Sequence, residues 1–271
     1  DPKETTGLQV KGGDVVDGVD EIVGRRSEFN RPTVNAFIRP MVEATRDAIA
    51  AAATDDEVRV VVLASAVDGY FSAGADLNEF KGMTSDDMRE WVGLCHEIAT
   101  LLRSAPKPLL AAIHGTAVGG GLEMTLHCDM RFAADNARLG QPEVSIAFIP
   151  PIATTQALVR LIGRPRTLKY LYEGQLLKAA EAHAWGLVDE LCEPDQLRSD
   201  VQEYAEGLTK QSATALAAIR RTVTIGGGMT FDDGMQLELE TASALADTAD
   251  FAEGIDAFLT KRTQRWERHG S

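Results

Sequence analysis

The chain has 271 residues, of which 44% are hydrophobic, so it is long enough for one large domain, or one domain with an appendage, around a sizeable core. Its formal net charge at pH 7 is -14, which argues against a nucleic-acid groove because the phosphate backbone requires clustered basic residues. An anionic ligand would have to be held by local Lys or Arg side chains or by main-chain N–H groups.

The cysteines Cys95, Cys128 and Cys192 lie far apart and match no metal-binding spacing, so we predict no metal site. An odd, sparse set of cysteines indicates a reducing compartment. The sequence shows no signal-peptide pattern and no apolar run long enough to span a bilayer. We therefore expect a cytoplasmic protein that binds neither a membrane nor nucleic acid.

The first third of the chain mixes weak and strong signals. In residues 1–28 the apolar residues are scattered among Gly and Asp, and the run 24–28 (GRRSE) is predicted to break any buried strand. Apolar residues at helical spacing predict a helix over residues 34–53, and the β-branched run 58–64 predicts a buried strand. Small residues within 70–80 then either bring main chain close to a ligand or form a simple strand-to-helix loop.

The central stretch combines a strand, three glycines and the start of a helix. An apolar run at 108–113 predicts a buried strand, and Gly119, Gly120 and Gly121 precede a helical pattern at 122–128. Consecutive glycines cost main-chain entropy, so they indicate a tight turn or a ligand held against bare main chain. No Gly-Lys-Ser/Thr of a nucleotide loop follows. The sharper alternative is a pocket of N–H groups for an oxyanion, which needs a second donor from elsewhere.

The other elements predict an α/β body followed by helices alone. A helix is expected over 84–104, with Ser85 as a candidate N-cap. After the glycines we expect strands at 130–133 and 187–191, with helices between them at 155–162, 166–173 and 179–184. The tail pattern predicts helices at 197–210, 213–223, 231–246 and 250–261. We therefore predict a layered body with right-handed crossovers over residues 1–195 and a C-terminal helical region over 196–271.

Four motifs occur along the chain in one order. They are residues 71–77 (FSAGADL), 118–123 (VGGGLE), 140–143 (GQPE), and the tail runs 250–254 (DFAEG) and 258–262 (FLTKR). Together they resemble the crotonase superfamily, the enoyl-CoA hydratase/isomerase fold, over residues 30–262. The resemblance implies a crotonase-like (ClpP/crotonase) α/β spiral of repeated ββα units with a C-terminal helical region.

The resemblance also supplies the second donor and a pair of acids. It implies that the N–H groups of Ala75 and Gly120 hold the thioester oxygen of an acyl-CoA, where each fixed donor lowers the barrier by roughly 3–4 kcal/mol in comparable oxyanion sites. It implies Glu123 and Glu143 as the catalytic carboxylates, one activating water while the pair delivers a proton to the α-carbon. Like charges this close in an apolar pocket are expected to raise at least one pKa.

For the coenzyme, the resemblance implies contacts from Ala73, Ala75, Asp76, Leu77, Asn78, Gly120, Phe258 and Lys261. The last two belong to the tail, which in such proteins can serve a neighbouring subunit; a Lys at a helix C-terminus is otherwise ordinary dipole complementarity. No covalently bound cofactor is expected, because coenzyme A arrives as part of the acyl-CoA substrate. The resemblance further implies a homotrimer or a dimer of trimers.

The chain departs from the family pattern at residues 149–152 (IPPI), where members usually have Ile-Pro-Gly and a small, glycine-rich turn. Pro151 lacks an N–H and Ile152 is bulkier than the usual residue, so a turn that orients Glu143 or shapes the acyl pocket would alter substrate choice or activity. We interpret His114 as a packing residue. The other histidines show no constellation: His96, His127, His183 and His269.

We therefore predict an enzyme of fatty-acid metabolism, an enoyl-CoA hydratase that adds water across the α,β-double bond of a trans-2-enoyl-CoA. An isomerase, or a thioester hydrolase or lyase, would use the same oxyanion hole, but isomerisation needs only one base and both Glu123 and Glu143 are present. A catalytically silent scaffold or an RNA binder is disfavoured by the two glutamates and by the acidic charge.

Overall fold

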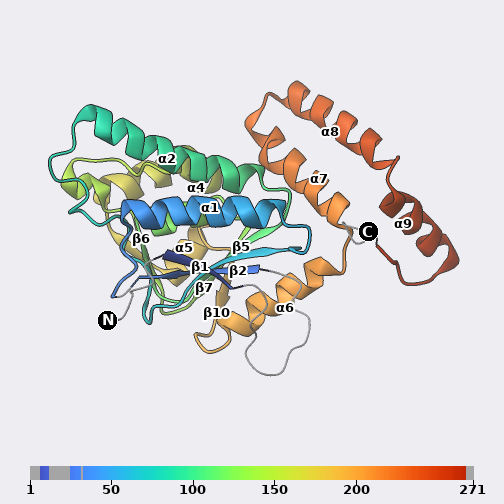
Figure 1. The fold of residues 1–271 in the computed structure, drawn as a ribbon, viewed down its shortest axis with the longest axis horizontal. Coiled ribbons are helices and arrows are strands. Elements are labelled where there is room, and N and C mark those ends of the chain that lie inside the picture. Colours follow the sequence, from blue (N-terminus) through green and yellow to red (C-terminus); the bar gives the residue numbers. More distant parts are fainter. Residues whose placement is uncertain (1–6, 12–24, 32, 267–271) are drawn as a thin grey trace.

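The structure, a computed structural model, describes residues 7–11, 25–31 and 33–266, and its body is built on two sheets (Figure 1). The six-stranded sheet contains, in spatial order, β1 (Gly7–Lys11), β2 (Arg25–Asn30), β3 (Val61–Ser65), β5 (Leu109–Ile113), β7 (Met130–Ala134) and β10 (Glu190–Cys192). The four-stranded sheet contains β4 (Tyr70–Ser72), β6 (Thr116–Val118), β8 (Arg138–Gly140) and β9 (Leu176–Lys178). Apart from the antiparallel pairs β1–β2 and β8–β9, neighbouring strands run parallel.

Helices cover the sheets and then continue alone along the tail. The body contains α1 (Arg39–Thr54), α2 (Ser85–Ser104), α3 (Gly120–Thr125), the 3-10 turn η1 (Glu143–Ile146), α4 (Thr154–Glu173) and α5 (Ala179–Trp185). The C-terminal region contains α6 (Leu197–Thr209), α7 (Ala213–Thr224), the 3-10 turn η2 (Gly226–Gly228), α8 (Phe231–Leu245) and α9 (Ala249–Thr260). The predicted α/β fold with a helical C-terminal region is confirmed, whereas the domain boundary at residue 195 stays a prediction.

A strand of the large sheet, a strand of the small sheet and a helix recur as one unit: β3–β4–α2, β5–β6–α3 and β7–β8–α4. Because β4, β6 and β8 pair in parallel and in that order, their carboxyl ends lie at one edge of the small sheet. Ligands of α/β folds bind at such an edge. The repeat therefore gathers three short segments in one place: 73–77, 119–121 and 141–143.

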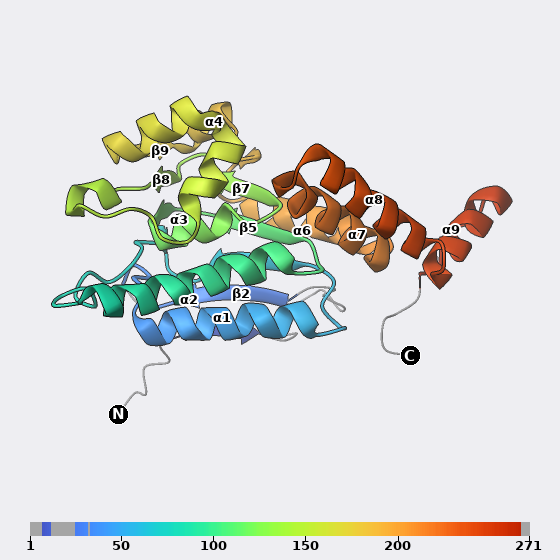
Figure 2. The same cartoon turned by 90° about the horizontal axis from the view of Figure 1, so that it is seen from above.

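The central strands of the large sheet are buried on both faces. In β5, Leu109, Ala111 and Ile113 belong to the cluster that contains apolar side chains of α1 and α2, whereas Leu110 packs with Leu197 of α6. Figures 1 and 2 show α1 and α2 side by side, and Figure 1 shows α6 across the sheet from them. The continuous apolar run predicted as a buried strand is thus explained by two covering layers.

Two local predictions are wrong. Residues 25–28 of the run 24–28 do not break a strand, because the main chain of β2 pairs with β1 on one side and β3 on the other, and that pairing uses groups every residue except proline can supply. The N-cap of α2 is Thr84 rather than Ser85, since Thr84 and Asp87 bond each other's main-chain N–H in a capping box. The scattered apolar residues between 12 and 24 lie outside the described residues.

In the part of the chain that the structure describes, no helix is both long and apolar enough to cross a membrane. Among the same residues, no group of three or more His, Cys, Asp or Glu side chains could hold a metal ion. The cysteines Cys95, Cys128 and Cys192 are buried free thiols, and burial raises the pKa of each to about 12. They are therefore held as unreactive thiols at physiological pH.

Helices α7 to α9 extend away from the body, and one buried arginine of α7 ties them to it (Figures 1 and 2). The Nε of Arg220 lies 2.8 Å from Oδ2 of Asp129. Its guanidinium also donates to the carbonyls of Leu102 at 2.6 Å and Arg103 at 3.0 Å. These carbonyls end α2 and have no partner within the helix, so Arg220 caps α2 and holds α7 beside it.

Replacing this residue should loosen the whole protein. Arg220→Met should lower the free energy of unfolding by about 3 kcal/mol, because the carbonyls of α2 would lose their buried partner and Asp129 would lose its positive one. Urea unfolding followed by circular dichroism measures the change. Arg221→Met is the matched control, since the exposed Arg221 bonds Thr241 at 3.2 Å and should matter by less than about 0.5 kcal/mol. Equal stability of the two variants would contradict this role for Arg220.

Candidate active site

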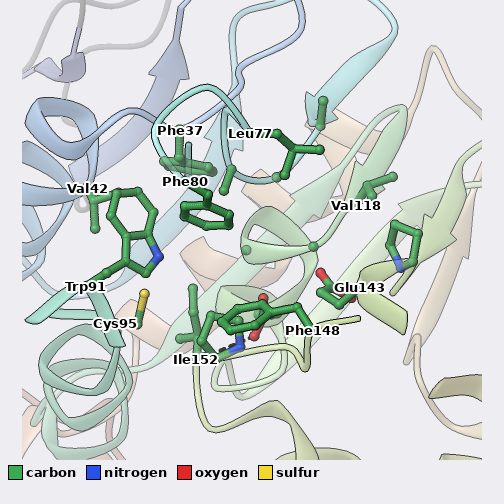
Figure 3. Close-up of a pocket in the computed structure, with 18 of the residues that line it drawn as sticks. Phe37, Val42, Leu77, Phe80, Trp91, Cys95, Val118, Glu143, Phe148 and Ile152 are labelled. Atoms are coloured by element: carbon green, nitrogen blue, oxygen red, sulfur yellow. Dashed lines mark hydrogen bonds between the residues drawn. The ribbon is translucent and has the colours of Figure 1, made fainter. Parts of the chain in front are cut away.

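A cavity of about 160 Å³ lies where the segments after β4, β6 and β8 face helix α2 (Figure 3). Both predicted carboxylates, Glu123 and Glu143, line it. Most of its other wall residues are apolar: Phe37, Val42, Ala73, Ala75, Leu77, Phe80, Trp91, Cys95, Ile98, Val118, Met124, Phe148, Pro151 and Ile152. The fold therefore brings the two acids, which come from separate units of the repeat, to one largely apolar chamber.

The segments after β4 and β6 touch through their main chains. Gly74 has φ 81° and Gly119 has φ 51°, conformations that side chains rarely adopt. A Cβ added at Gly74 would lie 3.1 Å from the carbonyl oxygen of Val118 and 3.6 Å from the nitrogen of Gly120. A Cβ added at Gly121 would lie only 2.2 Å from Cβ of Ser72. Glycines are thus required here because the two segments approach each other closely, which agrees with the tight-turn interpretation of the sequence.

Two main-chain N–H groups at this contact are not used by the secondary structure around them. Phe37 donates to the carbonyl of Gly74 and accepts from the N–H of Asp76, so the N–H of Ala75 points to the opposite side, where the segment after β6 lies. Gly120 is the first residue of α3, so its N–H has no partner within the helix. Both residues line the cavity. Among the described residues, neither N–H donates a hydrogen bond to the main chain outside the helices and strands.

Glu123 lies in the first turn of α3 and is 1% exposed. Its Oε2 accepts the N–H of Ile152 at 2.7 Å and the hydroxyl of Thr154 at 2.6 Å. Its Oε1 has no hydrogen-bond partner among the described residues. Burial, and to a smaller extent the nearby Glu143, raise the pKa of Glu123 to about 8 against the opposing effect of the bonds from Thr154 and Ile152. One oxygen is therefore held in place and the other is free to bind a ligand or water.

Glu143 begins the turn η1, directly after the rigid Pro142. With its amide nitrogen turned towards Glu143, the buried Gln141 donates to Oε2 of Glu143 at 3.1 Å and to Oε1 at 3.2 Å. A Cβ added at Gly119 would lie 2.8 Å from Oε1 of Glu143, so this carboxylate rests against the glycine stretch. Burial raises the pKa of Glu143 to about 7. The predicted rise of at least one pKa thus applies to both acids.

The residues predicted to contact the coenzyme divide into three groups. Ala73, Ala75, Leu77 and Gly120 line the cavity. Asp76 and Asn78 shape the loop itself, because Oδ1 of Asp76 accepts the N–H of Asn78 at 3.1 Å and Oδ2 lies 3.2 Å from Arg31. Phe258 on α9 and Lys261 at its C-cap lie at the far end of the molecule from α3 (Figures 1 and 2).

The turn at 149–152 holds Glu123 rather than Glu143, the acid that the sequence suggested for it. The N–H that the turn donates to Glu123 belongs to Ile152, so the lack of an N–H on Pro151 removes no hydrogen bond from Glu123. The side chain of Ile152 also walls the cavity, 3.5 Å from where a Cβ on Gly120 would lie. No local pattern marks Ile152 and Thr154 as partners of Glu123, because they follow it by 29 and 31 residues. Gln141 could have been found, since it belongs to the motif that contains Glu143.

A sequence model of the enoyl-CoA hydratase/isomerase family matches residues 26–269. The chain belongs to this family. It is therefore an enzyme of the crotonase superfamily with hydratase or isomerase activity, as the motifs predicted.

Named relatives and solved structures agree with this assignment. The chain is 32% identical to the crotonyl-CoA hydratase of Syntrophomonas wolfei over 235 aligned residues. The alignment covers 86% of this chain and 90% of that protein. The short-chain-enoyl-CoA hydratase of Clostridium acetobutylicum shows the same identity and coverage, 32%, 86% and 90%. The crystal structure of an enoyl-CoA hydratase from Bacillus anthracis superposes with a TM-score of 0.88 at 30% identity, covering 97% of this chain and 99% of that chain. These matches confirm the predicted crotonase fold.

Burial of Glu123 has a measurable effect on stability. Because its pKa is raised from 4.5 to about 8 in the folded protein, the contribution of Glu123 to folding stability is largest below pH 4.5 and is lost as the pH rises from 4.5 through about 8. Glu123→Gln cannot ionise, so its melting temperature relative to the natural protein should rise between pH 5 and pH 8. Scanning calorimetry over this range, with the exposed Glu203→Gln as control, measures the difference. A difference that stays constant with pH would contradict the burial of an ionisable group.

Proposed function

We propose that the chain is an enoyl-CoA hydratase, which adds water across the α,β-double bond of a trans-2-enoyl-CoA. The observation that carries this proposal is that Glu123 and Glu143 line one cavity beside the N–H groups of Ala75 and Gly120. Hydration needs a base, an acid and a place for negative charge, and this arrangement has groups suited to all three. The named hydratases among the relatives support the same choice.

The thioester oxygen is the atom that these N–H groups would hold. As water adds to the β-carbon, negative charge moves onto that oxygen, and fixed donors aimed at it stabilise the transition state by roughly 3–4 kcal/mol each. The donors are main-chain groups anchored by Phe37 on one side and by α3 on the other, so they need no rearrangement during the reaction. The contact between Gly74 and Gly120 keeps the two donors near each other.

The two acids share protons near neutral pH, since burial brings their pKa values to about 8 and about 7. The single proton can sit on either acid. In the reactive form it is on Glu143, two donors on Oε2 stabilise the negative charge of Glu123, and its free Oε1 accepts a proton from water. The water oxygen bonds to the β-carbon while protonated Glu143 gives its proton to the α-carbon. The overall change is addition of one water molecule, and solvent exchange then restores the pair.

The acyl tail would extend from the two acids towards α2. The wall there is formed by buried apolar side chains, including Phe37, Val42, Trp91 and Ile98, and the Trp91 ring packs edge-on against Phe80 at 5.2 Å. Apart from the two glutamates, none of the described residues that line the cavity has a charged side chain. An uncharged hydrocarbon tail fits this wall, because an ionised group buried there would find no partner.

The coenzyme would leave the cavity past Ala73 and Leu77, with the loop of Asp76 and Asn78 at the mouth. Phe258 and Lys261 could serve this coenzyme only from a neighbouring copy of the chain, since they lie far from the cavity of their own chain (Figure 2). This arrangement agrees with the expected homotrimer or dimer of trimers. Phe258 is 79% exposed, so it is free to make such a contact.

Hydration can be tested directly with crotonyl-CoA and a longer trans-2-enoyl-CoA, following loss of the enoyl thioester absorbance. Glu123→Gln and Glu143→Gln should each lower kcat by about 100-fold or more, because each removes one proton-transfer group. The exposed Glu203→Gln should behave as the natural protein does. Turnover of a 3-enoyl-CoA without any hydration would replace the proposal with the isomerase alternative.

The proposed tail preference gives a separate test. An enoyl-CoA whose acyl chain ends in a carboxylate should have kcat/KM at least roughly 100-fold below that of the methyl-ended chain of equal length, because its charge would be desolvated beside Trp91 and Ile98. Competition assays with both substrates measure the ratio. Equal use of the two substrates would show that the tail does not lie against this wall.

A further inference from the structure

His127 is a buried histidine that the proposed reaction does not use. It follows Glu123 by four residues, and its N–H still bonds the carbonyl of Met124, so the helical turn continues and both side chains leave the same side of it. Both reach Ile152. The N–H of Ile152 donates to Oε2 of Glu123 at 2.7 Å, and Nε2 of His127 lies 2.7 Å from the carbonyl oxygen of Ile152. The N–H of Ile152 is thus bonded to Glu123 and its carbonyl to His127, two side chains of the segment that begins with α3.

The turn that contains Ile152 has little means of holding itself. Pro150 and Pro151 have no N–H to donate. Ala153 has φ 52°, a left-handed conformation that is unfavourable for a residue with a Cβ. A hydrogen bond to the Ile152 carbonyl fixes the peptide that joins Ile152 to Ala153, and so opposes relaxation of this strained turn.

The same carbonyl determines which form of His127 is present. A carbonyl oxygen only accepts, so the proton must be on Nε2. Nδ1 is buried without a partner among the described residues. Burial lowers the pKa of His127, and the charges of Arg103 and Arg131 lower it further, so the ring stays neutral. The neutral ring therefore supplies a donor at Nε2.

We propose that His127 is a positioning residue for Glu123: by holding the Ile152 carbonyl it keeps the Ile152 N–H and the Thr154 hydroxyl aimed at Oε2, which leaves Oε1 free for water. Thr154 belongs to this unit because it starts α4 two residues after Ile152 and bonds the same oxygen at 2.6 Å. The inference rests on the proposed hydration for its kinetic test. Its thermodynamic test does not depend on turnover.

Loss of the donor should act on the charge of Glu123. The charged group that acts on this carboxylate is Glu143 across the cavity, and the N–H of Ile152 and the hydroxyl of Thr154 act on it as hydrogen-bond donors. The thiol of Cys95 on α2 lies within its influence. Only the two donors favour the ionised form. If the turn relaxes, both bonds lengthen and Glu123 becomes harder to ionise.

The kinetic test compares His127→Leu with His127→Gln. Leucine removes the donor, so kcat for hydration should fall about 10-fold with KM within about 2-fold, and the acid limb of the pH profile should move to higher pH. Glutamine can place a side-chain N–H near the position of Nε2, so it should restore most of the loss and the original limb. His127→Asn is polar but too short, and should resemble leucine. Equal activity of the Gln, Asn and Leu variants, or a loss confined to KM, would overturn the proposal.

The thermodynamic test needs no substrate. At pH 9, Glu123→Gln should raise the melting temperature more in the His127→Leu protein than in the natural protein, because ionised Glu123 is less well supported when the turn is loose. The same comparison in the His127→Gln protein should match the natural one. Equal gains in all three proteins would overturn the role of His127 even if hydration is confirmed. Absence of hydration in the natural protein would instead overturn the proposed function alone.

Discussion

The close main-chain contact between the segments after β4 and β6 is the constraint on which the site depends. A Cβ at Gly121 would lie 2.2 Å from Cβ of Ser72, and one at Gly74 would lie 3.1 Å from the carbonyl of Val118. Any side chain at these positions would push the segments apart, and with them the N–H groups of Ala75 and Gly120. The entropy that glycine loses on folding is the cost of bringing two bare main chains to one point. Parallel pairing of β4 with β6 makes the contact possible, because it places their carboxyl ends at the same edge.

Burial of the two acids lowers the stability of the fold but raises their pKa values. An ionised carboxylate in an apolar cavity destabilises the fold, and Glu123 has only two donors to offset this. The same burial raises the pKa values of Glu123 and Glu143 to about 8 and about 7, which brings acid and base forms within reach at neutral pH. Active sites commonly accept such a loss of stability in exchange for useful proton affinities. The turn around Ile152 limits the loss, since it supplies both donors from a segment outside the glycine stretch.

The C-terminal helices differ from the body in the surface that they expose. Arg220 fixes α7 to the end of α2, and beyond it the tail presents large apolar side chains to solvent, with Phe231 82%, Phe258 79% and Leu259 72% exposed. Isolated apolar residues on a surface are ordinary, but a tail that carries this many fits burial against another copy. That agrees with the proposal that a neighbouring chain completes the binding site for the coenzyme. The rigid attachment through Arg220 would hold such a tail in a defined direction.

The fold class, the two acids and the glycine stretch could be predicted from the sequence, because they depend on local patterns: buried strands at 58–64 and 108–113, helices at regular spacing, and motifs around Ala75, Glu123 and Glu143. The strand β2 and the short strands β4, β6 and β9 escaped such patterns, since their pairing depends on neighbours brought by crossovers. Only the tertiary structure decided which donors hold Glu123, because Ile152 and Thr154 come from 29 and 31 residues further along the chain. It also decided that His127 faces the same turn, for a hydrogen bond between distant segments leaves no mark in either segment alone.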